Sequence, residues 1–257
     1  RSFVPLFPLA VEQFDLRGFD LLISLSYAVA HGIVPRSDQL HISYVHTPLR
    51  YLWQTYQEFL QENRLANGTK SFLVRIIFHC LRLWDRVSAD RVDNFLAASR
   101  WVAGSIWRAY RREAQVIYPP VDVRKFQPME PRGDYYLVVS RFERYKKVSL
   151  VIEAFAQLKL PLIVVGQGSQ QRELARLATP NIQILSWQTD SALQELMGRA
   201  KAVVHAAEED FGIALVEAQA AGCPVIAYGK GGAVETVIAG QTGILFPEQS
   251  VENLIQA

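Results

Sequence analysis

The sequence predicts an α/β protein of two doubly wound domains joined by a linker. Short, near-continuous apolar runs alternate with segments of helical spacing, which is typical of parallel strands covered on both faces by helices. One stretch, residues 118–134, interrupts this alternation with four prolines and several charges. A chain of 257 residues is also longer than most single domains. These observations place the first domain at 1–117, the linker at 118–134 and the second domain at 135–257.

The expected elements follow from the apolar runs. The first domain has predicted strands at 19–27, 40–48 and 94–99 and predicted helices at 51–61 and 101–110. The second domain is more regular, and each of its strands leads into a helix. Its predicted strands are 135–140, 162–166, 182–186, 202–207, 224–228 and 243–246. Its predicted helices lie near 147–158, 170–178, 190–199, 212–221 and 232–238, and a last helix ends the chain.

Composition and the chain ends set further limits. A net charge of +2 gives no strong electrostatic reason to expect a nucleic-acid partner. Cys80 and Cys223 lie far apart in unlike contexts, so we expect no disulfide framework, a reducing compartment and a cytoplasmic location. No apolar run approaches the roughly 18–20 residues of a spanning helix, and no signal peptide is visible. The chain starts at Arg1 without Met and stops inside a helical pattern at Ala257, so we expect a fragment of a longer protein.

Charged residues and glycines gather after the strands of the second domain. In doubly wound sheets, ligands bind beyond the carboxyl ends of the strands. The positions found there are Arg141, Lys146, Gly166, Glu209, Gly212, Gly231 and Gly232. The two cations can hold a diphosphate, a helix that starts near Gly212 offers backbone N–H groups to the same anion, and the glycine pair permits close backbone approach. The alternative for the cations is a solvated basic loop.

Two acids accompany this expected anion site. Glu209 lies in the loop, and Glu217 lies more than one turn into the following helix. A carboxylate repels a diphosphate but accepts hydrogen bonds from sugar hydroxyls. A nucleoside diphosphate sugar has one sugar on each side of its diphosphate, so two acids beside a cationic site match that ligand. Glu217 could instead be a partly buried structural acid.

Three segments together resemble a known family. EEDFGIALVEAQAAGCPVIAYGKGGAVETV (208–237) resembles the donor-site motif of retaining GT-B glycosyltransferases of family four, or glycosyl transferase group 1. SRFERYKKVSLVIEAF (140–155) resembles their diphosphate-binding segment, and YVHTPLR (44–50) resembles the first-domain segment that faces the donor sugar. The YVHTP and EEDFG segments are most similar to those of bacterial mannosyltransferases of O-antigen and exopolysaccharide synthesis. The resemblance implies two Rossmann-like domains facing a central cleft, the first of them incomplete because the family's early glycine-rich loop is missing.

The resemblance also implies roles for individual residues. Arg141 and Lys146 would neutralise the leaving diphosphate, Glu217 would bind the ribose hydroxyls, and Glu209 would contact the transferred sugar. His46 would lie near that sugar on the acceptor side, and we expect catalytic roles for it and for Arg141, Lys146 and Glu209. The backbone positions implied in donor binding are Gly166, Phe211, Gly212, Ile213, Gly231 and Gly232. Such enzymes bind no metal because protein cations replace it, and the sequence has no Asp-x-Asp motif.

The implied reaction is retaining transfer of a hexose from a nucleotide sugar to a glycan or lipid-linked acceptor. Mannose is the expected sugar and GDP-mannose the expected donor. Two alternatives stay open at this point. One is a non-catalytic fragment that binds a nucleotide sugar, and the other is a transferase or epimerase of the same fold that uses a UDP-sugar.

Three other features of the sequence give weaker indications of function. Residues 166–171 (GQGSQQ) begin like a dinucleotide fingerprint but lack its third glycine, so we reject that function. Residues 70–86 mix apolar residues with four cations, which fits either a core helix with snorkelling basic side chains or a helix in peripheral contact with an anionic membrane, at the inner face of the cell membrane. The four cations are Lys70, Arg75, Arg82 and Arg86. Four other histidines have no metal-ligand spacing and are expected at the surface or satisfied in the core: His31, His41, His79 and His205.

Overall fold

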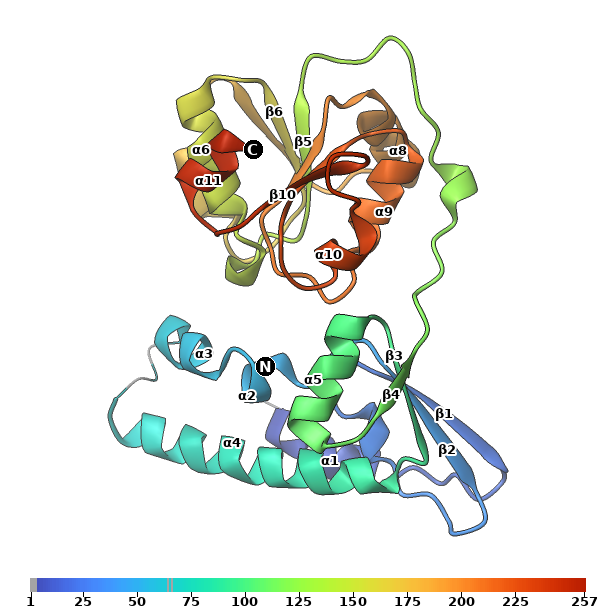
Figure 1. Cartoon of the computed structure of the whole chain (residues 1–257). Helices are drawn as coiled ribbons and strands as arrows, with labels where there is room; N and C mark the ends of the chain where they lie inside the picture. The colour runs from blue at the N-terminus through green and yellow to red at the C-terminus, as the bar shows by residue number, and fades with distance from the viewer. Residues whose placement is uncertain (1–3, 64, 66) are drawn as a thin grey trace. The chain divides into compact units, whose positions relative to one another are not determined.

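The computed structural model describes residues 4–63, 65 and 67–257 (Figure 1). The chain divides into two compact units between Tyr118 and Pro119, and each unit contains one parallel sheet with helices. The expected α/β fold class with parallel sheets is therefore confirmed. Within the described ranges, every helix is too short or too polar to cross a membrane.

Unit 1 is built on a sheet of four parallel strands in the order β1-β2-β3-β4. The strands are β1 (Leu21–Ser26), β2 (Leu40–Val45), β3 (Asn94–Ala97) and β4 (Ala114–Val116). Its α-helices are α1 (Phe7–Val11), α2 (Arg50–Trp53), α3 (Tyr56–Glu62), α4 (Thr69–Ser88) and α5 (Arg100–Tyr110). The three predicted strands are confirmed. The fourth strand has no counterpart in the prediction, because its three residues, Ala-Gln-Val, contain no apolar run.

The helix predicted at 101–110 is α5, and a local contact determines where it begins. Ser99 caps it, since its Oγ accepts a hydrogen bond from the Val102 N–H at 3.0 Å. The apolar face of α5 then packs into a cluster with Phe95 of β3. The helix predicted at 51–61 is two helices instead, interrupted at Gln54 and Thr55, where the Gln54 amide donates to Ser105 of α5 at 2.9 Å.

Unit 2 has a sheet of six parallel strands in the order β10-β9-β8-β5-β6-β7. The strands are β5 (Tyr136–Val139), β6 (Leu162–Val165), β7 (Ile182–Leu185), β8 (Val203–His205), β9 (Val225–Tyr228) and β10 (Gly243–Phe246). The α-helices are α6 (Val148–Leu158), α7 (Gln171–Leu177), α8 (Asp190–Arg199), α9 (Ile213–Ala220), α10 (Ala233–Thr236) and α11 (Val251–Gln256). All six predicted strands and all six predicted helices are confirmed. Numbered within the unit, the strand order is 3-2-1-4-5-6, which is the Rossmann order.

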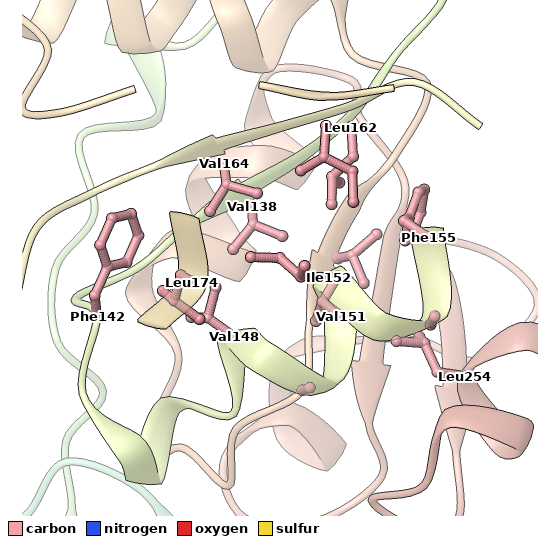
Figure 2. Packing of buried hydrophobic residues seen from close by; sticks show 14 of the residues in the cluster. Val138, Phe142, Val148, Val151, Ile152, Phe155, Leu162, Val164, Leu174 and Leu254 are labelled. Carbon is pink, nitrogen blue, oxygen red and sulfur yellow. The ribbon is translucent and has the colours of Figure 1, made fainter. Parts of the chain in front are cut away.

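Both faces of this sheet are buried, which is why its strands are continuous apolar runs. Val138 of β5 packs with α6 and α11 in one cluster, which also contains Ile152 and Leu254 (Figure 2). Its neighbour Leu137 points to the opposite face, into a cluster that includes Leu215 of α9. Successive residues of a strand point to opposite faces. The helices on either side therefore hold the sheet, and with it the ends of its strands, in place.

The stretch expected to be a linker belongs mostly to unit 2, which begins at Pro119. Met129 N–H donates to the Gly198 carbonyl at 3.1 Å, and Gly133 N–H donates to that of Arg199 at 2.8 Å. The Arg132 guanidinium donates to the carbonyls of Ala200 and Gly222. These bonds run to the end of α8 and the turn after α9, and residue spacing in the sequence does not reveal them.

Candidate functional site

The predicted binding residues of unit 2 lie where the strand order of its sheet reverses. β5 and β8 are neighbours, but the chain leaves them toward opposite faces, to α6 after β5 and to α9 after β8. This is the topological switch point at which doubly wound sheets bind ligands. The loop after β5 carries Arg141 and Lys146, and the loop after β8 carries Glu209.

Lys146 and His205, from the ends of these two strands, meet at the Glu209 carboxylate. Lys146 Nζ lies 2.5 Å from Glu209 Oε1, and His205 Nε2 lies 2.7 Å from the same oxygen. His205 is the last residue of β8, and Lys146 lies in a short 3₁₀ turn after β5. The Lys146 and Glu209 side chains are only 15% and 16% exposed, so water screens their interaction weakly. The structure thus joins two of the predicted site residues directly.

Lys146 and His205 decide the charge state of Glu209. Burial on its own raises the pKa of a carboxyl group, but the hydrogen bond and charge of His205 and the charge of Lys146 outweigh burial and lower the pKa of Glu209 to about 2. Glu209 is therefore a carboxylate at neutral pH. It can accept hydrogen bonds from hydroxyl groups, and it is too weak a base to take up a proton there.

Two glycines press the loop after β9 against the loop that carries Glu209. Gly232 N–H donates to the Glu209 carbonyl at 2.7 Å. A Cβ added at Gly231 would lie 2.3 Å from that same oxygen, and one added at Gly232 would lie 2.4 Å from Phe211 Cα. Only glycine fits at such separations. The predicted positions Glu209, Phe211, Gly231 and Gly232 therefore form one tightly packed backbone surface.

Gly212 begins α9 in the left-handed conformation, with φ +89°. The predicted donor-site residue Ile213 is the first residue of α9, and its side chain is exposed. A helix start presents backbone N–H groups to an anion. Glu217, one turn further, is half-buried. Burial, assisted by the charge of Asp190, raises the pKa of Glu217.

The GQGSQQ stretch supports the loop after β5. A Cβ on Gly166 would lie 1.8 Å from the Ser140 carbonyl oxygen. The buried residue Phe142 is held by two backbone hydrogen bonds, from its N–H to the Gln167 carbonyl and from the Gln170 N–H to its own carbonyl, both at 2.9 Å. Gly166 therefore acts on the site through the loop it supports. The close packing against Ser140 and Phe142 explains why glycine occupies positions 166 and 168, although the stretch is not a dinucleotide fingerprint.

Arg141 lies on the same loop but does not join the Glu209 cluster. Its guanidinium donates to the Tyr145 hydroxyl, and it is exposed. Lys146 Nζ lies 5.3 Å from the centroid of the Tyr145 ring, so the aromatic ring stands beside both cations. The two predicted cations are thus neighbours through Tyr145, one half-buried against a carboxylate and one facing solvent.

His46 belongs to unit 1 and follows β2. Its N–H donates to the Ser26 carbonyl at 2.7 Å, and its half-buried ring lies edge-on to Tyr44, with centroids 5.1 Å apart. His46 therefore lies just beyond the carboxyl end of a strand in unit 1, as Lys146 and Glu209 do in unit 2. Its role toward a sugar stays a prediction.

The sequence analysis missed the role of His205. It was expected at the surface or satisfied in the core, and it is buried, but its partner is the site carboxylate. Its position at the end of a predicted strand, four residues before Glu209, was the available signal. Among the described residues, no three His, Cys, Asp or Glu side chains are grouped so that they could hold a metal ion.

Known proteins share both the sequence pattern and the fold of this chain. The family model described as glycosyl transferases group 1 matches residues 122–257, slightly more than half of the chain. Alpha-1,3/1,6-mannosyltransferase alg-2 of Neurospora crassa is 28% identical over 237 residues, 70% of this chain and 50% of that protein. The corresponding enzyme of Rhizomucor pusillus is 29% identical, over 63% of this chain and 48% of the protein.

Solved structures agree on the fold. The crystal structure of the Anabaena protein HepE in complex with UDP matches 100% of this chain and 71% of that protein, with a TM-score of 0.68 and 18% sequence identity. The chain spans about half the length of the two curated mannosyltransferases. The family match includes the whole Glu209 cluster and both predicted acids. The chain belongs to the family of glycosyl transferases group 1.

Proposed function

We propose that this chain is part of a retaining hexosyltransferase that transfers mannose from GDP-mannose to a glycan or lipid-linked acceptor in polysaccharide synthesis. The observation that carries the proposal is the cluster of Lys146, Glu209 and His205 at the switch point of a Rossmann-type sheet. The two mannosyltransferase relatives support mannose as the sugar. HepE, whose structure holds UDP, shares the fold only, so a UDP-sugar is the competing donor.

The charges of the site suit the departure of a diphosphate. When the bond between the anomeric carbon and the diphosphate oxygen breaks, positive charge develops on the sugar and negative charge on the diphosphate. In this proposal, Lys146, Arg141 and the N–H groups at the start of α9 stabilise that negative charge. A donor diphosphate would share Lys146 with Glu209, and binding therefore rearranges this ion pair.

The acids serve hydroxyl groups in this mechanism. Glu209 stays ionised at neutral pH, so it accepts hydrogen bonds from the transferred sugar. Because its pKa is so low, it is a poor base for the acceptor hydroxyl, and the departing diphosphate oxygen takes that proton on the same face of the sugar. The half-buried Glu217 accepts hydrogen bonds from the ribose. For His46 we propose a role toward the acceptor.

Calorimetry of the chain with GDP, GDP-mannose, UDP and UDP-glucose tests the donor site. We expect GDP-mannose to bind most tightly, and Arg141→Gln to weaken binding roughly ten-fold or more, since hydrogen bonds to charged groups contribute about 1.5–3 kcal/mol. Arg176→Gln, an exposed arginine of α7, is the matched control and should bind as the wild type does. If UDP-glucose bound more tightly than GDP-mannose, the proposed donor would be a UDP-sugar instead. If Arg141→Gln and Arg176→Gln weakened binding equally, the proposed donor site would be wrong.

Transfer is measured separately from binding. Incubation with GDP-mannose and an acceptor glycan should give a mannoside whose anomeric configuration, read by NMR, matches that of the donor. Inversion would exclude the retaining mechanism. Binding without transfer or donor hydrolysis would support the non-catalytic alternative, and a new epimer formed without any acceptor would identify an epimerase.

A further inference from the structure

The long helix α4 of unit 1 has two apolar faces. One face packs inward through Phe78 and Leu81, which are buried against Leu49 and Leu52. The other face points to solvent, and its large apolar side chains are Phe72, Leu73, Ile76, Leu83 and Val87. They are between 44% and 69% exposed. The core-helix interpretation of residues 70–86 therefore explains only half of the apolar residues.

The exposed side chains form one stripe. At roughly 100° per residue, they all fall within a sector of about 100°, on the side of the helix away from Phe78 and Leu81. Spacings of four and eleven residues, as between Phe72, Ile76 and Leu83, keep them in line along the axis. A helix of 20 residues is about 30 Å long, so the stripe runs along most of that length. Contiguous apolar surface of this kind marks an interaction site.

Arginines flank this stripe on one side, and a lysine lies beyond its other edge. Arg75, Arg82 and Arg86 lie in the sector next to Phe72, whereas Lys70, in the first turn, lies beyond Leu73. The guanidinium groups of Arg75 and Arg82 lie 6.0 and 4.8 Å from the centroid of the Tyr56 ring, which holds both along the helix.

Acids are almost absent from the outer surface of this helix. The one acidic residue of α4 is Asp85, which is buried and accepts hydrogen bonds from Trp53 and Tyr110. Beyond the helix end, Asp90 pairs with Arg86 at 3.0 Å, and before its start the exposed Glu62 belongs to α3. Apart from the buried Asp85, the charged side chains of α4 are therefore Lys and Arg.

We propose that α4 docks unit 1 on an anionic lipid surface, lying in the plane of the membrane. Such interfacial helices bury an apolar stripe at the boundary of headgroups and acyl chains while their cations contact anionic headgroups. The charge of α4 complements that surface, and a nucleic acid would leave the apolar stripe unused. A lipid-linked acceptor would then be presented in the surface on which the chain rests. The donor site of unit 2 plays no part in this argument.

Vesicle co-sedimentation tests the docking on the whole 257-residue chain. Vesicles of phosphatidylglycerol and phosphatidylcholine should retain it, and vesicles of phosphatidylcholine alone should retain much less. Lys70→Gln with Arg75→Gln should weaken binding roughly five-fold for each charge removed, since each basic residue near an anionic surface contributes about 1 kcal/mol. Leu83→Gln should weaken it at least about ten-fold by removing apolar contact.

Matched variants in unit 2 control for charge and apolarity. Arg172→Gln with Arg176→Gln removes the same charge from the exposed surface of α7, and Ile244→Gln removes an exposed aliphatic side chain from β10. Both should bind vesicles as the wild type does. Circular dichroism checks that each variant keeps its helix content.

Three outcomes would overturn the proposal. The first is that anionic vesicles do not retain the chain, and the second is that they retain the wild type and the α4 variants equally. The third is a concentration-dependent dimer in sedimentation velocity that Leu83→Gln abolishes while vesicle binding is unchanged. The stripe would then be a contact between two copies of this chain.

Discussion

Substituting Glu209 by Gln tests whether the site carboxylate is held ionised by its neighbours. Its pKa is about 2, against an ordinary value of 4.5. A carboxyl group with a lowered pKa in the folded state contributes stability that is fully present above about pH 4.5 and is lost as the pH falls toward 2. The difference between the two pKa values is worth about 3 kcal/mol. The wild type should therefore lose up to about 3 kcal/mol relative to Glu209→Gln over that pH range.

The assay is urea unfolding of both proteins at pH 7, 5, 4 and 3, followed by circular dichroism. Every other carboxyl group titrates in both proteins, so its contribution cancels in the difference between them. Glu153→Gln, an exposed glutamate of α6, is the matched control for the removal of one carboxyl group. If the difference between Glu209→Gln and the wild type did not change with pH, His205 and Lys146 would not outweigh burial, and the argument for an ionised Glu209 would be wrong.

Three further predictions concern the backbone, the packing of the core and the titration of a buried carboxyl group. Gly231→Ala should destabilise unit 2 by about 1–3 kcal/mol and weaken nucleotide-sugar binding, because φ is +73° and the new Cβ would lie 2.3 Å from the Glu209 carbonyl oxygen. Gly104→Ala is the control: it lies within α5 with open space around its Cβ and should stabilise unit 1 by about 0.5–1 kcal/mol. Urea unfolding measures both changes. Ile152→Ala should cost about 2–5 kcal/mol in the same measurement, since the side chain is fully buried against the sheet; a loss below 1 kcal/mol would contradict that packing. Burial raises the pKa of Asp85 to about 6, so the wild type should lose about 3 kcal/mol relative to Asp85→Asn as the pH rises from about 4 to above 6, and a loss as the pH falls would reverse the sign of the argument.

The elements of unit 2 were predictable because each strand is a short apolar run buried on both faces. Leu137 and Val138 are an example: these adjacent residues pack into the clusters on opposite faces of the sheet, so both must be apolar. In unit 1 the same method missed β4, whose pairing with β3 comes from sheet geometry and not from its own side chains. It also joined α2 and α3 into one helix, because the contact between Gln54 and Ser105 spans 51 residues of sequence.

The candidate site was predictable in its members and not in its contacts. Spacing after the strands identified Lys146 and Glu209, and the strand order brings them to 2.5 Å across 63 residues of sequence. His205 was missed because a lone histidine in a sequence has no partner until the fold supplies one. The glycines at 231 and 232 were expected to allow a ligand close, and in the structure they allow the Glu209 loop close.

The sequence by itself determined the α/β class, the alternation of strands and helices and the family motif, because these depend on local periodicity and on residue types at strand ends. The tertiary structure decided the charge state of Glu209, the membership of residues 119–134 in unit 2 and the outward face of α4. Each of these depends on which surfaces are buried and which charges meet across the sheet. Burial and long-range contact are properties of the folded chain, and no local pattern of residues contains them.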